Sequence, residues 1–256
     1  MERLARERLV VVLSLAGVVA LAWLWLWRQA AAMHMSAVEM PGMAMNMPAM
    51  TTPDALGVAL VFLMWAVMMA GMMLPSAAPT ILLYGAMVQK HAERGSVLPA
   101  VWIFVAGYLL VWAAFSLGAA LLQALLQHAS LLDAMLSSSS KALSALLLSA
   151  AGIYQLTPLK DRCLSKCRAP LPFFMTHWRA GKLGALRMGM SHGAYCVGCC
   201  ALLMLLLFAV GVMNLAWVAA IAAFVLVEKL LPAGRITARA CGAALIALGA
   251  GTLLLS

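Results

Sequence analysis

Three thiols and an imidazole lie within nine residues of one apolar stretch, at His192, Cys196, Cys199 and Cys200. An α-helix turns by 100° per residue, so it would place these four side chains within an arc of about 100°. Thiolate sulfur and imidazole nitrogen are preferred protein ligands of Cu(I) and Zn(II). A single buried cysteine commonly acts as a small apolar residue, but three beside a histidine on one helix face indicate a soft-metal site.

A second pair of thiols, Cys163 and Cys167, lies four residues apart in a basic stretch. One helical turn would present both thiols to the same ion. The surrounding lysines and arginines would favour the thiolate form that binds metal. We therefore expect this pair to complete the metal site.

Methionines supply further soft sulfur. Met64, Met68 and Met72 repeat every four residues and would form one stripe on a helix. Such stripes most often fill gaps in a core, but thioethers also bind Cu(I). The candidate metal ligands are Cys163, Cys167, His192, Cys196, Cys199, Cys200, Met68 and Met72.

The elements that position these residues must lie in a membrane. Hydrophobic residues make up 66% of the 256 residues and charged residues 10%, far below the roughly 25% charged residues of soluble domains. Apolar runs of about 20 residues, enough to cross a bilayer, recur along the chain. We predict an all-α, polytopic transmembrane helical bundle of about seven spans. The predicted spans are 9–27, 55–74, 98–126, 141–156, a fifth that carries the cysteines and ends near 210, 215–231 and 236–255.

The basic residues predict the orientation. With the N-terminus in the cytoplasm and seven alternating spans, 15 of the 17 lysines and arginines fall on the cytoplasmic side. Only Arg28 and Lys141 fall outside, so the positive-inside rule favours an N-in, C-out protein of the bacterial inner membrane. The net charge of +9 reflects these loops, and we expect no nucleic-acid partner.

Composition divides the chain into three parts. Residues 1–32 form an N-terminal membrane anchor, with small residues at its end that would also suit a signal-peptidase site. Residues 33–54 form a Met-rich extracytoplasmic loop, which either gathers copper weakly or serves as a linker. Residues 55–256 form a six-span metal-binding domain. In this topology both cysteine groups and the end of the second span lie near the cytoplasmic face, so we expect one shared site.

Three segments resemble a known family. Residues 64–76, 163–170 and 192–204 look like signatures of bacterial proteins described as predicted metal-binding integral membrane proteins. The resemblance covers about residues 55–255 and implies metal binding, but it implies no reaction. An aromatic residue usually follows the Cys-Cys pair in that family, whereas Ala201 stands here.

Three functions fit these features. The first is copper handling by a membrane protein that binds Cu(I) for acquisition, transfer or delivery, with a protein partner for metal transfer. The second is a structural zinc-thiolate site in a membrane assembly protein, and the third is a membrane thiol oxidoreductase. Paired carboxylates, a Ser/His/Asp arrangement and a nucleotide-binding glycine loop are missing from the sequence, so an enzyme is the less favoured class. Asp133 and Glu228 lie near predicted span ends, and we expect both at the membrane interface.

Overall fold

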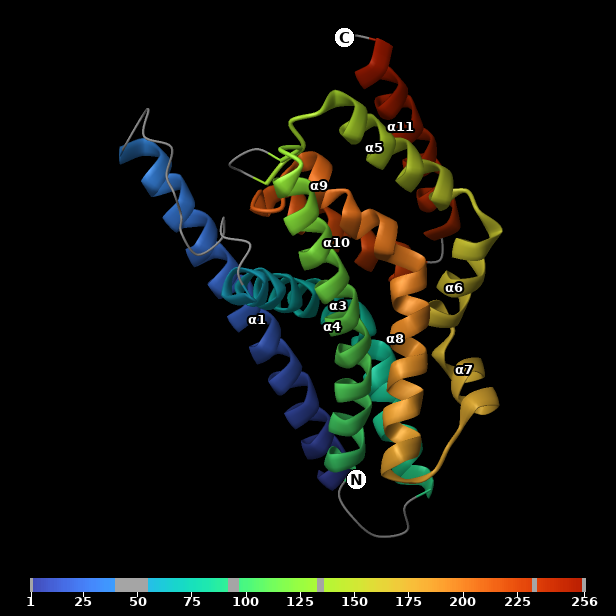
Figure 1. Cartoon of the computed structure of the whole chain (residues 1–256). Helices are drawn as coiled ribbons and strands as arrows, with labels where there is room; N and C mark the ends of the chain where they lie inside the picture. Colours follow the sequence, from blue (N-terminus) through green and yellow to red (C-terminus); the bar gives the residue numbers. More distant parts are fainter. Residues whose placement is uncertain (1, 40–54, 92–96, 133–135, 232–233, 255–256) are drawn as a thin grey trace.

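The computed structural model describes residues 2–39, 55–91, 97–132, 136–231 and 234–254. Every regular element in these ranges is a helix (Figure 1), which agrees with the predicted all-α class. The helices are α1 (Glu2–Glu39), α3 (Ala55–His91), α4 (Leu98–His128), α5 (Lys141–Gln155), α6 (Pro158–Arg168), α7 (Pro170–His177), α8 (Gly181–Leu205), α9 (Leu207–Val210), α10 (Leu215–Leu230) and α11 (Gly234–Leu254).

The number of spans differs from the predicted seven. Within the described residues, five segments are long and apolar enough to cross a membrane, and a sixth is added if the bent pair α5 and α6 counts as one span. The candidate spans are Ala5–Ala32, Leu56–Lys90, Leu98–His128, Gly181–Val210 and Gly234–Leu254. The predicted sixth span corresponds to α10, which has only 16 residues. At 1.5 Å per residue such a helix covers about 24 Å, less than the roughly 30 Å of a bilayer core.

α3 does not end at its prolines. The second span was predicted to stop at residue 74, but α3 continues through Pro75 and Pro79 to His91. A proline inside a helix removes a backbone hydrogen bond and costs about 3 kcal/mol. The carbonyls that lose a backbone donor lie four residues before each proline, at Gly71 and Pro75. Neighbouring helices can offset this cost in a membrane protein, and α3 packs against α1 and α4.

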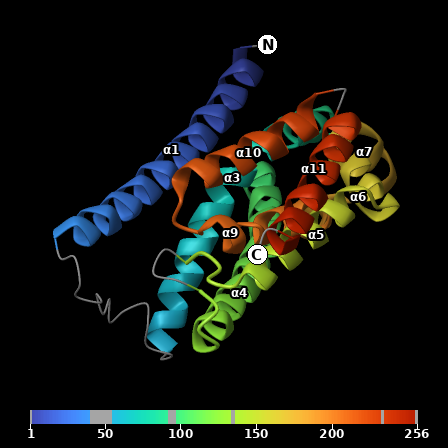
Figure 2. The same cartoon turned by 90° about the horizontal axis from the view of Figure 1, so that it is seen from above.

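α1 also continues past its predicted end and reaches Glu39. The first part of the Met-rich segment, which we expected to be an irregular loop, is therefore helical. Residues 40–54 lie outside the described residues. α1 packs along α3 (Figure 2), where Gly71 faces Ala22 and Trp23.

α4 and α8 lie side by side and run in the same direction (Figure 1). Glycines set their spacing: a Cβ atom at Gly107 would meet the backbone of Leu186 and Met190, and one at Gly189 would meet the backbone of Phe104 and Tyr108. The backbones thus approach closely, as small residues allow in membrane helix pairs. This contact fixes the height of the cysteines on α8 relative to Tyr108 on α4.

Substitution of Gly189 tests this contact. We expect Gly189→Ala to lower thermal stability in detergent, because the added methyl group meets the Phe104 carbonyl and forces the helices apart. Overpacking of this kind costs about 1–3 kcal/mol. Gly118→Ala is the matched control on α4, since a Cβ atom there has open space. Equal melting temperatures of the two variants would contradict the close contact.

Candidate metal centre

Cys196 is the centre of a buried polar cluster inside the bundle. Its sulfur lies 3.0 Å from the hydroxyl oxygen of Tyr108 on α4. The ammonium group of Lys229 on α10 donates to the same sulfur at 2.9 Å and to the hydroxyl of Ser76 on α3 at 3.1 Å. All of these side chains are buried. Four helices therefore converge on one thiol.

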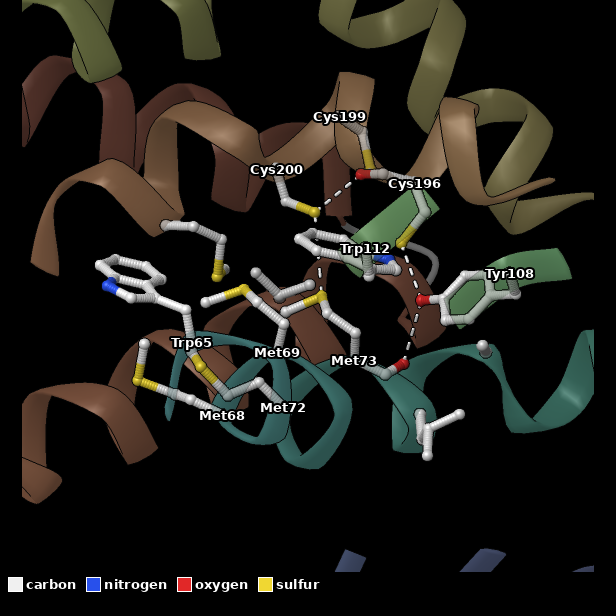
Figure 3. Packing of buried hydrophobic residues seen from close by; sticks show 14 of the residues in the cluster. Trp65, Met68, Met69, Met72, Met73, Tyr108, Trp112, Cys196, Cys199 and Cys200 are labelled. Carbon is white, nitrogen blue, oxygen red and sulfur yellow. Dashed lines mark hydrogen bonds between the residues drawn. The ribbon is translucent and has the colours of Figure 1, made fainter. Parts of the chain in front are cut away.

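The next two cysteines lie one turn further along α8. The thiols of Cys199 and Cys200 both donate to the backbone carbonyl of Cys196, at 3.1 and 2.7 Å. The sulfur of Cys200 also lies 3.9 Å from the thioether sulfur of Met73 on α3 (Figure 3). As the helical spacing predicted, the cysteines of α8 point into one region of the interior.

α6 brings a fourth thiol. Cys167 is buried, and its thiol interacts with those of Cys196 and Cys199. We call Cys167, Cys196, Cys199 and Cys200 the thiol cluster. The expected proximity of the Cys-x3-Cys pair to the α8 cysteines therefore holds for Cys167.

Cys163 lies beside the cluster rather than within it. Its sulfur packs against Gly198, where a Cβ atom would approach it to 2.9 Å. The carbonyl of Gly198 also accepts a hydrogen bond from the hydroxyl of Tyr154 on α5. The absence of a side chain at Gly198 thus lets α6 lie against α8.

The methionine at the cluster is not one of those predicted. Met68 and Met72 are buried on α3, but Figure 3 shows them further from Cys200 than Met73. Met64, Met68 and Met72 do lie on one face of α3. Met73, the residue after Met72, is turned by 100° around the helix and is the one that contacts the thiols. Met73 therefore replaces Met68 and Met72 as the nearest thioether.

His192 is buried one turn before Cys196 on α8. Its ring stacks on those of Phe104 and Tyr108, with centroids 6.2 and 5.8 Å away. Its Nδ1 atom has no hydrogen-bond partner in the described part of the chain. A buried ring nitrogen without a partner is a candidate ligand, so His192 stays a predicted ligand at the edge of the cluster.

The cysteines are not arranged around a common metal position. Among the described residues, no group of three or more His, Cys, Asp or Glu side chains has the geometry to hold an ion. The thiols of Cys199 and Cys200 instead point to a carbonyl. Their chemistry nevertheless fits a soft ion, because four thiols and a thioether lie together in a buried region. Metal binding would require these thiols to rotate away from the carbonyl.

The sequence-based reasoning missed the charges at this site. Glu228, which was expected at the membrane interface, and the adjacent Lys229 are both buried inside the bundle. Glu228 forms an ion pair with Lys160 on α6 at 2.5 Å, and Lys160 also donates to Gln155. The adjacent Lys229 points to the thiols. The sequence did contain a sign of this role, since Glu228 and Lys229 follow each other in an otherwise apolar segment. Charged residues inside membrane-spanning segments are usually functional.

The lysines and arginines predicted to act on the neighbouring thiols are Lys160, Arg162, Lys166 and Arg168, and two of them have other partners. Lys160 points to Glu228 instead, and Arg168 donates to the carbonyl of Leu231. The cation that contacts a thiol is Lys229.

Cys241 is separate from the cluster. It lies on α11, is only partly buried, and interacts with Gln155. Cys241 is therefore not a candidate ligand of the thiol cluster.

Comparison with known proteins gives one family. A family model described as "PpoB2: Copper chaperone" matches residues 62–252. The matched region contains the whole thiol cluster, Met73, Tyr108 and Lys229. No curated protein and no solved structure matches the chain.

Proposed function

The chain belongs to the PpoB2 copper chaperone family, and from this premise we propose that it is an integral membrane protein that binds Cu(I) at the thiol cluster and passes it to a protein partner. The observation that carries this proposal is the meeting of Cys167, Cys196, Cys199 and Cys200 beside the thioether of Met73. All five donors are soft sulfur, the ligand type that selects Cu(I). Hard oxygen ligands of the Asp or Glu type do not contact them among the described residues.

Lys229 supports an anionic metal complex at this position. Cu(I) bound by two or three thiolates carries a net negative charge, which is costly to bury unless a cation lies nearby. The ammonium of Lys229 lies 2.9 Å from the Cys196 sulfur. We propose that Lys229 balances this charge and orients Cys196, while Tyr108 holds the same sulfur from the opposite helix.

Metal content tests the proposal. Protein purified under anaerobic conditions should contain stoichiometric copper, and X-ray absorption should show Cu(I) with sulfur neighbours at about 2.3 Å. Tetrahedral zinc in place of copper would favour the structural zinc alternative. Metal-free protein whose thiol count falls reversibly with oxidant would favour the thiol oxidoreductase. Either outcome would overturn copper handling at this site.

The helix directions fit a topology in which the starts of α1, α4 and α8 share one side, and the basic residues favour the cytoplasm for that side. The carboxylate of Glu7 near the start of α1 accepts a hydrogen bond from the backbone of Val97 at the start of α4, so these two starts lie together. α4 and α8 run in parallel, which requires the chain to return between them. We propose that the bent pair α5 and α6 makes this return as one span, and that the starts of α1, α4 and α8 face the cytoplasm.

Labelling tests this topology. A single cysteine or reporter placed near residue 175 should be accessible only from the cytoplasm, and one in residues 33–50 only from outside. A reporter at the C-terminus tests α10: the predicted C-out orientation requires α10 to cross, and a cytoplasmic C-terminus would show that it does not. A reporter near residue 175 that is active only outside the cytoplasm would overturn the map and would reopen disulfide formation for Cys163 and Cys167.

A further inference from the structure

α3 and α8 carry a group of buried methionines, of which Met73 contacts the thiol cluster. The two helices run in opposite directions here: Trp65 of α3 packs on Phe208 just after α8, with ring centroids 5.2 Å apart, and eight residues later Met73 contacts Cys200. The methionines between these two contacts are all buried, at 2% exposure or less. They are Met64, Met68, Met69, Met72 and Met73 on α3, and Met204 on α8.

The neighbours in this group are close enough for a metal to pass between them. Residues three or four apart on a helix have Cβ atoms about 5–6 Å apart. This spacing joins Met64 to Met68 and Met72, Met72 to Met69, Met69 to Met73, and Cys200 to Met204. Methionine has three rotatable bonds, so its sulfur can move between such positions. Figure 3 shows Met68 and Met72 beside Trp65, and Met69 and Met73 nearer to Cys200.

The last step of this series is short enough for one ion to bridge it. Two metal–sulfur bonds of about 2.3 Å allow a sulfur–sulfur separation up to roughly 4.6 Å. The Met73 and Cys200 sulfurs are 3.9 Å apart. One Cu(I) ion can therefore bind both before it leaves the thioether.

We propose that these six methionines form a path for Cu(I) from the end of the bundle near Trp65 and Phe208 to the thiol cluster. This inference rests on the proposed function and adds the entry route. In the proposed topology, the Trp65 end faces outward. Residues 33–50, which contain seven methionines, precede this end of α3 in the sequence.

The chemistry of the ligands sets the direction. Thioethers are neutral, so Cu(I) held by methionines alone keeps its full charge in a buried position, which is costly. Thiolates neutralise that charge, and copper therefore accumulates at the cluster. Copper remains Cu(I) throughout: at each exchange one copper–sulfur bond forms as another breaks, and a cysteine that becomes a thiolate ligand releases its proton to solvent.

The test separates the rate of loading from affinity. Right-side-out membrane vesicles that contain the full chain receive Cu(I) as its membrane-impermeant bathocuproine disulfonate complex, and copper transfer is followed by the absorbance of that complex. We expect Met68→Leu/Met72→Leu to load about tenfold more slowly, equivalent to about 1.4 kcal/mol in the barrier. The copper bound at equilibrium should be unchanged. Leucine conserves volume and packing, so the fold should persist.

Met188→Leu is the matched control. Met188 is equally buried on α8, but it lies two turns before Cys196, on the other side of the cluster from the path. Met188→Leu should load at the rate of the unsubstituted protein.

Equal loading rates for all three proteins would overturn the path and leave the thiol site intact. A loss of equilibrium copper in Met68→Leu/Met72→Leu would also overturn it, because these methionines would then be ligands of the final site. Failure of the unsubstituted protein to take up copper would instead contradict the proposed function.

Discussion

Serine at position 196 or 199 is expected to abolish tight Cu(I) binding. Cys196 and Cys199 both interact with Cys167, so either substitution removes a soft ligand from the middle of the thiol cluster. Substitution of residues that only support metal ligands lowers metal affinity by about 10- to 100-fold. Removal of a ligand itself should therefore lower the Cu(I) affinity by more than about 100-fold. Anaerobic titration against a chromogenic Cu(I) chelator measures this loss.

Two other cysteines are controls for this experiment. Cys163 contacts Gly198 beside the cluster, so Cys163→Ser should weaken binding without removing it. Cys241 lies on α11 away from the cluster, so Cys241→Ser should bind Cu(I) like the unsubstituted protein. If Cys241→Ser lost copper as completely as Cys196→Ser, the effect would come from general misfolding and the assigned ligands would be wrong.

Loss of the buried carboxylate is the second large effect that we expect. In Glu228→Ala the ammonium of Lys160 stays buried without its ion-pair partner. The pair is 2.5 Å apart and each side chain is 1% exposed, and breaking a buried pair of this kind costs about 3–5 kcal/mol. Unfolding by SDS in mixed micelles should therefore occur at a clearly lower SDS fraction. Because α6 carries Cys167, the affinity for Cu(I) should fall as well.

Two variants decide whether the ion pair is responsible. Lys160→Met/Glu228→Leu removes both charges and should recover most of the stability, since apolar residues of similar size often replace buried pairs without loss. Asp161→Ala removes a surface pair with Arg235, which is 63% exposed, and should change the stability by less than about 1 kcal/mol. A double variant as unstable as Glu228→Ala would show that the carboxylate has a role other than pairing with Lys160.

The sequence alone was sufficient for the features that depend on local pattern. Apolar composition and run length indicated an all-helical chain with several helices long enough to cross a bilayer, and the described residues contain such helices. The spacing of Cys196, Cys199 and Cys200 placed their side chains on one helix face, since the helical rotation per residue is fixed. The i, i+4 spacing of Cys163 and Cys167 likewise matched a helix, α6.

Helix boundaries were less well predicted where packing competes with local preference. Pro75 and Pro79 favour a helix end by themselves, but α3 continues through both and packs against α1 and α4. α10 is apolar like its neighbours but too short to be counted among the spans.

The partners of the thiols were decided only by the tertiary structure. Lys229 lies 33 residues from Cys196 in the chain and Tyr108 lies 88 away, and no local pattern connects residues so far apart. The choice of Met73 over Met72 depends on how α3 is rotated against α8, which the packing of both helices sets. Glycines at the α4–α8 contact fix the height at which Tyr108 meets Cys196. The sequence therefore determined which groups could bind a soft metal, and helix packing determined which of them meet.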